Sequence, residues 1–176
     1  RHPPEKRDWL NRFRGGMMFF LGCHLVDMIY RFQGIPQSIT PMNRHTLTEG
    51  VDCPDYGFAV FDYGRGISFA KTSAAEVNGF ARRQLVITGT KASIELKPFE
   101  YYVPGGMTTG MKVTRHNQGK EWYDSGEMVE HPVFERYDTM MQEFAAAVCG
   151  EMELPYTYQS EIDVQKMVLE ACGIPV

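Results

Sequence analysis

The sequence predicts an α+β fold, in which an open, predominantly antiparallel β-sheet has helices packed on one of its faces. Helical spacing of apolar residues marks one stretch near the N-terminus and two near the C-terminus, whereas the middle of the chain alternates in paired short runs. Strands segregated from helices are typical of α+β proteins. The sheet face without helices would carry bulky aromatic residues, which makes it a candidate subunit interface.

The predicted strands form three hairpins. Residues 57–63 and 67–73 are joined by Gly-Arg-Gly, with Phe58 and Val60 on one face and Ala59 and Phe61 on the other. Two further hairpins join residues 82–88 to 93–99 and residues 111–116 to 120–125.

The first predicted helix begins at His24, just after Gly22, and ends before Gly34 and Pro36. Its apolar residues are spaced so that the helix is largely buried.

Two more helices are predicted near the C-terminus. Residues 136–150 carry an apolar stripe that ends at Gly150. The last helix begins at a capping box formed by Ser160 and Asp163 and ends before Gly173.

The length of 176 residues favours one domain, residues 1–176, with an irregular lead-in over residues 1–14. The opening at Arg1 has the character of the interior of a longer protein. The lead-in is basic and suits either an anionic ligand or a solvated loop anchored by aromatics. The net charge of -4 argues against nucleic acid as a partner, and no run reaches the length of a membrane helix. We expect a soluble, cytoplasmic protein.

The four cysteines, Cys23, Cys53, Cys149 and Cys172, are widely separated, so free and mostly buried thiols are expected. A metal site is not expected, because Cys23, His24 and Asp27 alone lack the convergent ligands that zinc needs.

His24 is the principal candidate for chemistry. Histidine titrates near neutral pH and can exchange a proton with a substrate hydroxyl, and Asp27, one helical turn later, could orient the ring. The alternative is a histidine that only caps or fills the core.

The run "GGMMFFLGCHLVDMIYRFQG" resembles the start of the C-terminal domain of the Gfo/Idh/MocA family of NAD(P)-dependent oxidoreductases, in which a glycine cluster precedes a Gly-x-His-x-x-Asp helix. The resemblance continues through "GFAVFDYGRGISFAKTSAAEVNG", "LVITGTKASIEL" and "YDTMMQEFAAAVCGE", and so covers nearly the entire chain.

The resemblance implies that a Rossmann domain, absent from this sequence, holds NAD or NADP in the intact parent. No cofactor is expected to bind this chain, since no Gly-x-Gly-x-x-Gly follows a strand and "PGGMTTG" at 104–110 has the wrong spacing. The family's catalytic set includes an aspartate four residues before the histidine, and here that position is Phe20. Ala92 also departs from the family, which often has glycine there.

The resemblance thus predicts the substrate-binding and oligomerisation domain of an oxidoreductase for a sugar, polyol or related hydroxy compound, inactive alone and dimeric or tetrameric through the open sheet face. The nicotinamide would take a hydride while His24 handles the hydroxyl proton. Two alternatives remain: a non-catalytic partner domain, motivated by Phe20, and an NAD-dependent glycoside hydrolase. Aromatic residues could form a sugar-binding wall or serve packing alone: Trp9, Trp122, Tyr123 and His131.

Overall fold

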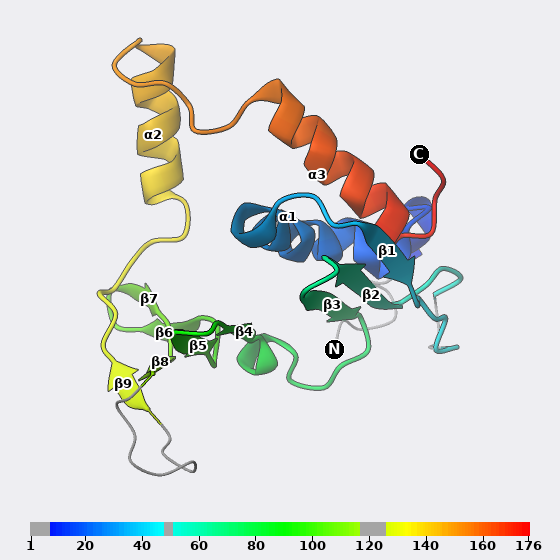
Figure 1. Ribbon diagram of the computed structural model, residues 1–176, viewed down its shortest axis with the longest axis horizontal. Helices are drawn as coiled ribbons and strands as arrows, with labels where there is room; N and C mark the ends of the chain where they lie inside the picture. Colours follow the sequence, from blue (N-terminus) through cyan, green and yellow to red (C-terminus); the bar gives the residue numbers. More distant parts are fainter. Residues whose placement is uncertain (1–7, 48–50, 117–125) are drawn as a thin grey trace. The chain divides into compact units, whose positions relative to one another are not determined.

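The computed structural model describes residues 8–47, 51–116 and 126–176, which form helices and antiparallel sheets (Figure 1). The predicted α+β class is confirmed. The chain divides into two compact units: unit 1 comprises Arg1–Val77 with Pro155–Val176, and unit 2 comprises Asn78–Leu154.

Most of the helical residues that the structure describes belong to unit 1. They form a 3-10 turn (Asp8–Arg12), a π-helical turn (Met18–Gly22), α1 (Cys23–Gln33) and α3 (Tyr158–Ala171). Gly34, at φ +73°, ends α1, and its N–H donates to the Tyr30 carbonyl at 2.7 Å.

The helix α3 begins earlier than the sequence predicts. Its N-cap is Thr157, which exchanges side-chain and backbone hydrogen bonds with Ser160 in a capping box. The predicted box of Ser160 and Asp163 is therefore wrong. Ser160 is the third residue of the helix, and Asp163 instead accepts from Gln159 and from the Tyr30 hydroxyl.

A three-stranded antiparallel sheet completes unit 1, in the order β1 (Ser38–Pro41), β2 (Tyr56–Asp62) and β3 (Ile67–Ser73). The predicted hairpin is confirmed: Ala59 lies opposite Ala70, and Gly64 supplies a positive φ of +76° in the turn.

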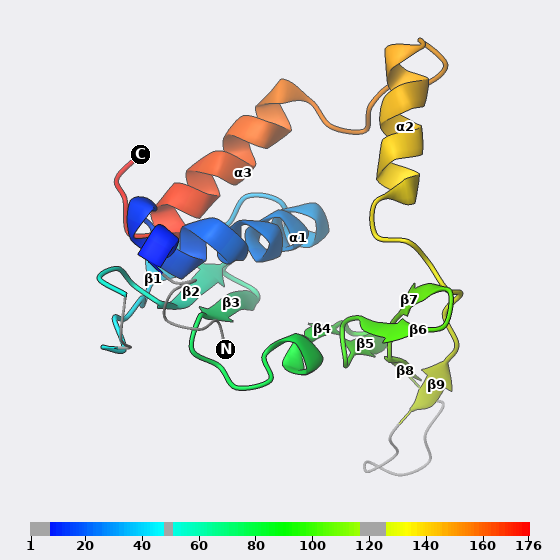
Figure 2. The same cartoon turned by 180° about the vertical axis from the view of Figure 1, so that it is seen from behind.

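The two faces of this sheet differ in character. Both α1 and α3 lie on one side of it, as Figures 1 and 2 show. Val26, Phe61, Met167 and other apolar side chains form the buried core between them. On the opposite face, the rings of Phe58 and Phe69 stack at a centroid distance of 5.7 Å, and Phe69 keeps 65% of its surface exposed.

Unit 2 begins with a 3-10 turn (Phe80–Arg82) and contains two antiparallel sheets. Their strands are β4 (Leu85–Thr88), β5 (Ala92–Leu96), β8 (Met111–Arg115) and β9 (Glu127–Val129) in one sheet, and β6 (Tyr101–Val103) and β7 (Gly106–Thr108) in the other. The β4–β5 hairpin was predicted, whereas β6 and β7 were not. The predicted strand over residues 120–125 lies outside the described residues.

The helix α2 (Asp138–Val148) follows the strands, and Gly150, at φ +76°, lies just beyond its end as predicted. None of its side chains is buried, and its apolar stripe of Met140, Met141, Phe144 and Val148 is exposed.

Candidate functional site

Two adjacent glycines begin the helical run that carries His24. Gly16 has φ +56°, and a Cβ atom there would lie 2.1 Å from the carbonyl oxygen of Pro54. A Cβ on Gly15 would lie 2.4 Å from the Sγ atom of Cys172. The Met17 N–H then donates to the same Pro54 carbonyl at 2.9 Å. Only glycine permits so close an approach of backbone to backbone.

The helical run is continuous from this turn through Gln33, so the prediction that the helix starts at His24 is wrong. Gly22 has helical angles of φ −64° and ψ −25° and does not break the run. The π-helical turn contains one more residue than an α-helical turn, and such turns are frequent at functional sites. His24 therefore lies inside a helix, on its second residue after the π-helical turn.

The His24 side chain is exposed to solvent, whereas Val26, two residues later, is fully buried. Within the part of the chain that the structure describes, no hydrogen bond reaches the His24 ring. Its imidazole is thus carried on a packed helix and is open to solvent.

Asp27 is engaged by a different residue. Both of its carboxylate oxygens accept from Nε of Arg31, at 3.0 and 2.9 Å. This hydrogen bonding raises the pKa of Arg31, whose guanidinium also lies 4.3 Å from the centre of the Tyr156 ring. Among the described residues no hydrogen bond joins Asp27 to His24, so an orienting role for Asp27 has no direct contact to support it.

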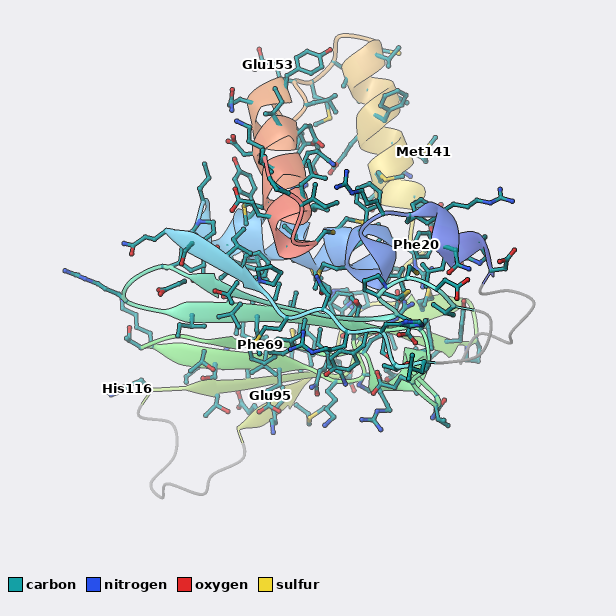
Figure 3. The ribbon with its side chains drawn as sticks, turned by 90° about the vertical axis from the view of Figure 1, so that its right-hand side faces the viewer. Phe20, Phe69, Glu95, His116, Met141 and Glu153 are labelled. Carbon is teal, nitrogen blue, oxygen red and sulfur yellow. The ribbon has the colours of Figure 1, made fainter. Side chains whose placement is uncertain are left out.

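Phe20 lies on the π-helical turn before α1 (Figure 3). It belongs to an aromatic cluster with Trp9 and Phe13. Its ring lies 4.3 Å from that of Trp9 and 5.5 Å from that of Phe13. All three side chains are half-buried. The position that the family resemblance assigns to an acid is therefore filled by a packed hydrocarbon ring, and Trp9 serves that packing.

The other predicted sugar-binding residues are Trp122, Tyr123 and His131. Trp122 and Tyr123 lie outside the described residues. His131 belongs to unit 2, where its Nδ1 atom lies 2.8 Å from the carbonyl oxygen of Pro132 and its ring packs edge-on against Phe134.

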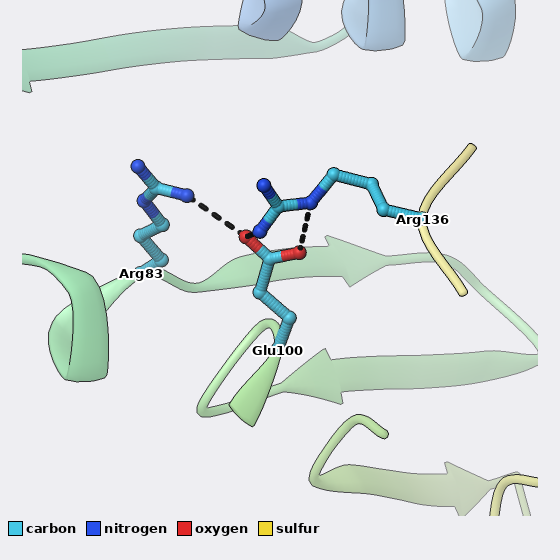
Figure 4. A network of polar contacts seen from close by, with 3 residues as sticks. All are labelled: Arg83, Glu100 and Arg136. Atoms are coloured by element: carbon cyan, nitrogen blue, oxygen red, sulfur yellow. Dashed lines mark hydrogen bonds and ion pairs between the residues drawn. The ribbon is translucent and has the colours of Figure 1, made fainter. Parts of the chain in front are cut away.

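One charged cluster in unit 2 was not predicted. Glu100, only 7% exposed, accepts from Nη1 of Arg83 at 2.8 Å and from Nε and Nη2 of Arg136 at 3.2 and 2.7 Å (Figure 4). The hydrogen bonds raise the pKa of Arg136. Arg83 and Arg136 lie 17 and 36 positions from Glu100, so no short sequence motif predicts this cluster.

All four cysteines are free, as predicted, but they are not mostly buried: Cys53 is buried, Cys23 and Cys172 are half-buried, and Cys149 is exposed. Burial and the nearby Cys23 raise the pKa of Cys172 to about 11. Burial also raises the pKa of Cys23. Thiols with raised pKa values are poor nucleophiles at neutral pH, so neither is a candidate for covalent chemistry.

In residues 8–47, 51–116 and 126–176, no three His, Cys, Asp or Glu side chains converge on a point where a metal ion could bind. None of the helices in the same ranges has the length and apolar character needed to cross a lipid bilayer.

The family profile for the GFO/IDH/MocA C-terminal domain matches residues 1–95, which is more than half of the chain and includes the glycine turn, His24 and Asp27. The chain belongs to this family. No curated protein matches it. The glycine turn and His24 agree with the family resemblance, and Phe20 stands where that resemblance implies an acid.

Solved structures share the fold of this GFO/IDH/MocA domain. One is a candidate oxidoreductase from Klebsiella pneumoniae, with a TM-score of 0.64 and 20% identity over 88% of this chain and 45% of the other. Another is the WlbA dehydrogenase from Bordetella pertussis, in complex with NADH and UDP-GlcNAcA, with a TM-score of 0.61 and 15% identity over 99% of this chain and 51% of the other. This chain thus spans about half the length of these proteins.

Proposed function

We propose that this chain is the substrate-binding and oligomerisation domain of an NAD(P)-dependent oxidoreductase that acts on a sugar, polyol or related hydroxy compound. The exposed His24 imidazole, on a helix fixed by the glycine turn, carries the proposal. The family match supports it, as does the structural likeness to the WlbA dehydrogenase, which is bound to NADH and a nucleotide sugar.

The step assigned to this chain is proton transfer. In oxidation, His24 removes the proton of a substrate hydroxyl; in the reverse direction it returns that proton to the carbonyl oxygen. Phe20 cannot share the proton, so His24 acts without a neighbouring carboxyl group at that position.

The glycine-rich stretch at 104–110 does not fit a dinucleotide site. This stretch forms the turn after β6, the strand β7 (Gly106–Thr108) and the two residues that follow it. It therefore offers no helix N-terminus for a pyrophosphate. We therefore assign NAD or NADP to a part of the intact parent outside this sequence.

The open face of the β1–β2–β3 sheet supports the oligomerisation role. Phe69 and Ile67 are 65% and 69% exposed there, beside the half-buried Phe58. Apolar residues gathered on one face mark interaction sites. A second copy of this chain is the proposed occupant, giving a homodimer or homotetramer.

A non-catalytic partner domain is the second candidate. The observation that favours it is the packing of Phe20 against Trp9 at the position where the family resemblance implies an acid.

Turnover of the longest product of this gene tests both candidates. With a panel of sugars and polyols and either NAD or NADP, the His24→Ala variant is expected to lose about 10²- to 10⁴-fold in kcat. The matched control is His116→Ala, which removes another exposed histidine. Unchanged turnover in His24→Ala contradicts the enzymatic role of His24 and favours the non-catalytic domain.

An NADH titration followed by tryptophan fluorescence tests the cofactor assignment. Binding by the long product but not by the 176-residue chain is the expected result. Binding by neither would contradict a nicotinamide-dependent parent. Formation of a keto product, as opposed to a released aglycone, separates oxidation from glycoside hydrolysis.

A further inference from the structure

The cluster of Arg83, Glu100 and Arg136 in unit 2 holds more positive charge than its buried carboxylate needs. Arg136 alone satisfies both oxygens of Glu100, since its Nε donates to Oε2 and its Nη2 to Oε1. Arg83 adds a second guanidinium, whose Nη1 donates to the same Oε1. Arginine stays protonated in proteins, so two cations face one carboxylate and one positive charge is left in surplus.

The two guanidinium groups meet solvent, whereas the carboxylate between them does not. The side chains of Arg83 and Arg136 are 46% and 37% exposed, and that of Glu100 is 9% exposed. Figure 4 shows the guanidinium groups on either side of the carboxylate, each with a terminal nitrogen directed away from it. These nitrogens are Nη2 of Arg83 and Nη1 of Arg136, which make no hydrogen bond to Glu100.

Most of the N–H donors of this arginine pair remain unused among the described residues. A guanidinium has five N–H donors. Arg83 donates one to Glu100, and Arg136 donates two to Glu100 and is hydrogen-bonded to the side chain of Tyr137. The carboxylate of Glu135, which is next to Arg136 in the sequence, lies instead beside β7, with Oε1 3.3 Å from the place of a Cβ on Gly106. An anion would therefore find donors that no described carboxylate occupies.

Other contacts already hold both arginines in place. The Arg83 carbonyl accepts from the N–H of Phe99 at 2.8 Å, and the Arg83 guanidinium lies 5.0 Å from the centre of the Phe80 ring. Phe134, two residues before Arg136, exchanges two backbone hydrogen bonds with β7, at 2.9 and 2.8 Å. Side chains that are ordered before binding lose little conformational entropy when a ligand arrives.

We propose that Arg83 and Arg136 together bind an oxyanion, the phosphate or carboxylate group of a small molecule, on the exposed side of Glu100. Guanidinium groups suit such anions because their paired N–H groups donate to two oxygens at once, and the opposite charges strengthen these hydrogen bonds. Glu100 holds the two cations together against their mutual repulsion and leaves one positive charge for the ligand. The proposal concerns unit 2 and does not depend on the reaction proposed for His24 in unit 1.

An NMR titration of the 176-residue chain tests the proposal through the Nε–H signals of its arginines. The probes are inorganic phosphate and succinate, with chloride at equal ionic strength as the reference. At least one probe is expected to shift the Arg83 and Arg136 signals saturably. Arg115, whose guanidinium pairs singly with Glu127, should respond to ionic strength alone. Binding of phosphate only identifies a phosphate ligand and binding of succinate only a carboxylate, whereas saturable shifts with neither probe overturn the proposal.

Two variants locate the binding. Arg83→Gln removes the surplus cation but leaves Arg136 on both oxygens of Glu100, so the variant is expected to fold and to bind the probe about tenfold more weakly or worse. Arg115→Gln removes the guanidinium of another exposed ion pair in unit 2 and is expected to leave binding unchanged. Circular dichroism first establishes that both variants fold. Equal affinity of Arg83→Gln and the unaltered chain places the anion elsewhere and overturns the proposal.

Discussion

Arg136 holds Glu100 by two hydrogen bonds, from Nε to Oε2 at 3.2 Å and from Nη2 to Oε1 at 2.7 Å, across 36 residues of sequence. Arg136 lies two residues before α2, and Glu100 directly precedes β6. The pair therefore fastens the segment that leads into α2 to the strands of unit 2.

Replacing Glu100 with glutamine should destabilise the chain. The substitution removes the charge that two guanidinium groups share, and because those groups remain partly exposed we expect a loss of about 1 to 3 kcal/mol in the free energy of unfolding. Urea unfolding measures it. Glu95→Gln, which breaks the more exposed pair with Lys112, is the control and should cost under about 1 kcal/mol. Equal losses would contradict a special role for Glu100.

Gly16→Ala should be among the most damaging small substitutions in unit 1. The new Cβ would meet the Pro54 carbonyl oxygen at 2.1 Å in a left-handed backbone, so we expect a loss of more than about 2 kcal/mol by thermal unfolding. Gly150→Ala isolates the conformational part of this loss. Gly150 has a φ of +76° but no neighbouring atom within 4 Å, so about 1 kcal/mol is expected there.

Stability should fall at alkaline pH because of Cys172. Its pKa of about 11 in the folded chain exceeds the unfolded value of about 8.5, so folding favours the protonated thiol. The stabilisation is fully present below the unfolded pKa and is lost as pH rises through the folded one. Burial also raises the pKa values of Tyr30 and Tyr63, which add to the decline at the upper end.

Unfolding free energies measured from pH 8 to 11 test this assignment. Cys172→Ala should flatten the decline, whereas Cys149→Ala, at an exposed cysteine, should leave it unchanged. A decline of the same slope in Cys172→Ala would assign it to other groups.

Phe69→Lys should weaken self-association. A charge placed on the open sheet face opposes burial against a second copy, so sedimentation equilibrium of the 176-residue chain should show a shift toward monomer. Val77→Lys, at another exposed apolar residue of unit 1, is the control. A dimer that survives Phe69→Lys unchanged does not use this face.

Asp27→Asn in the intact parent should leave the pH profile of kcat/KM in place, because Asp27 is committed to Arg31 rather than to His24. Loss of this exposed pair should lower stability by only about 0.5 kcal/mol. A displaced acid limb in the profile would instead restore Asp27 as a positioning residue for His24.

Periodicity predicted the elements whose pattern is local. The β2–β3 hairpin and the end of α2 were visible because alternation and glycine punctuation depend on neighbouring residues alone. The start of the helical run was misplaced because Gly22 resembles a helix breaker, whereas its lack of a side chain accommodates Met18, whose Sδ would lie 2.3 Å from a Cβ there.

The candidate site was predictable only in part. His24 and the glycines before it stand in one short stretch, which a reader of the sequence can recognise. Two basic residues lie one helical turn from Asp27: His24, three residues before it, and Arg31, four residues after it. In the structure Asp27 pairs with Arg31. The Glu100 cluster depends on tertiary pairing between distant residues, for which one sequence carries no signal.

The close backbone contact between Gly16 and Pro54 positions the helix that carries His24 independently of the side chains around it. This helix is held in position by main-chain contacts, such as the hydrogen bond from the Met17 N–H to the Pro54 carbonyl, which a change of side chain elsewhere does not remove. The side chains at positions 9, 13 and 20 can therefore change, and with them the chemical character of the neighbouring surface, while the backbone contacts that hold the His24 helix remain.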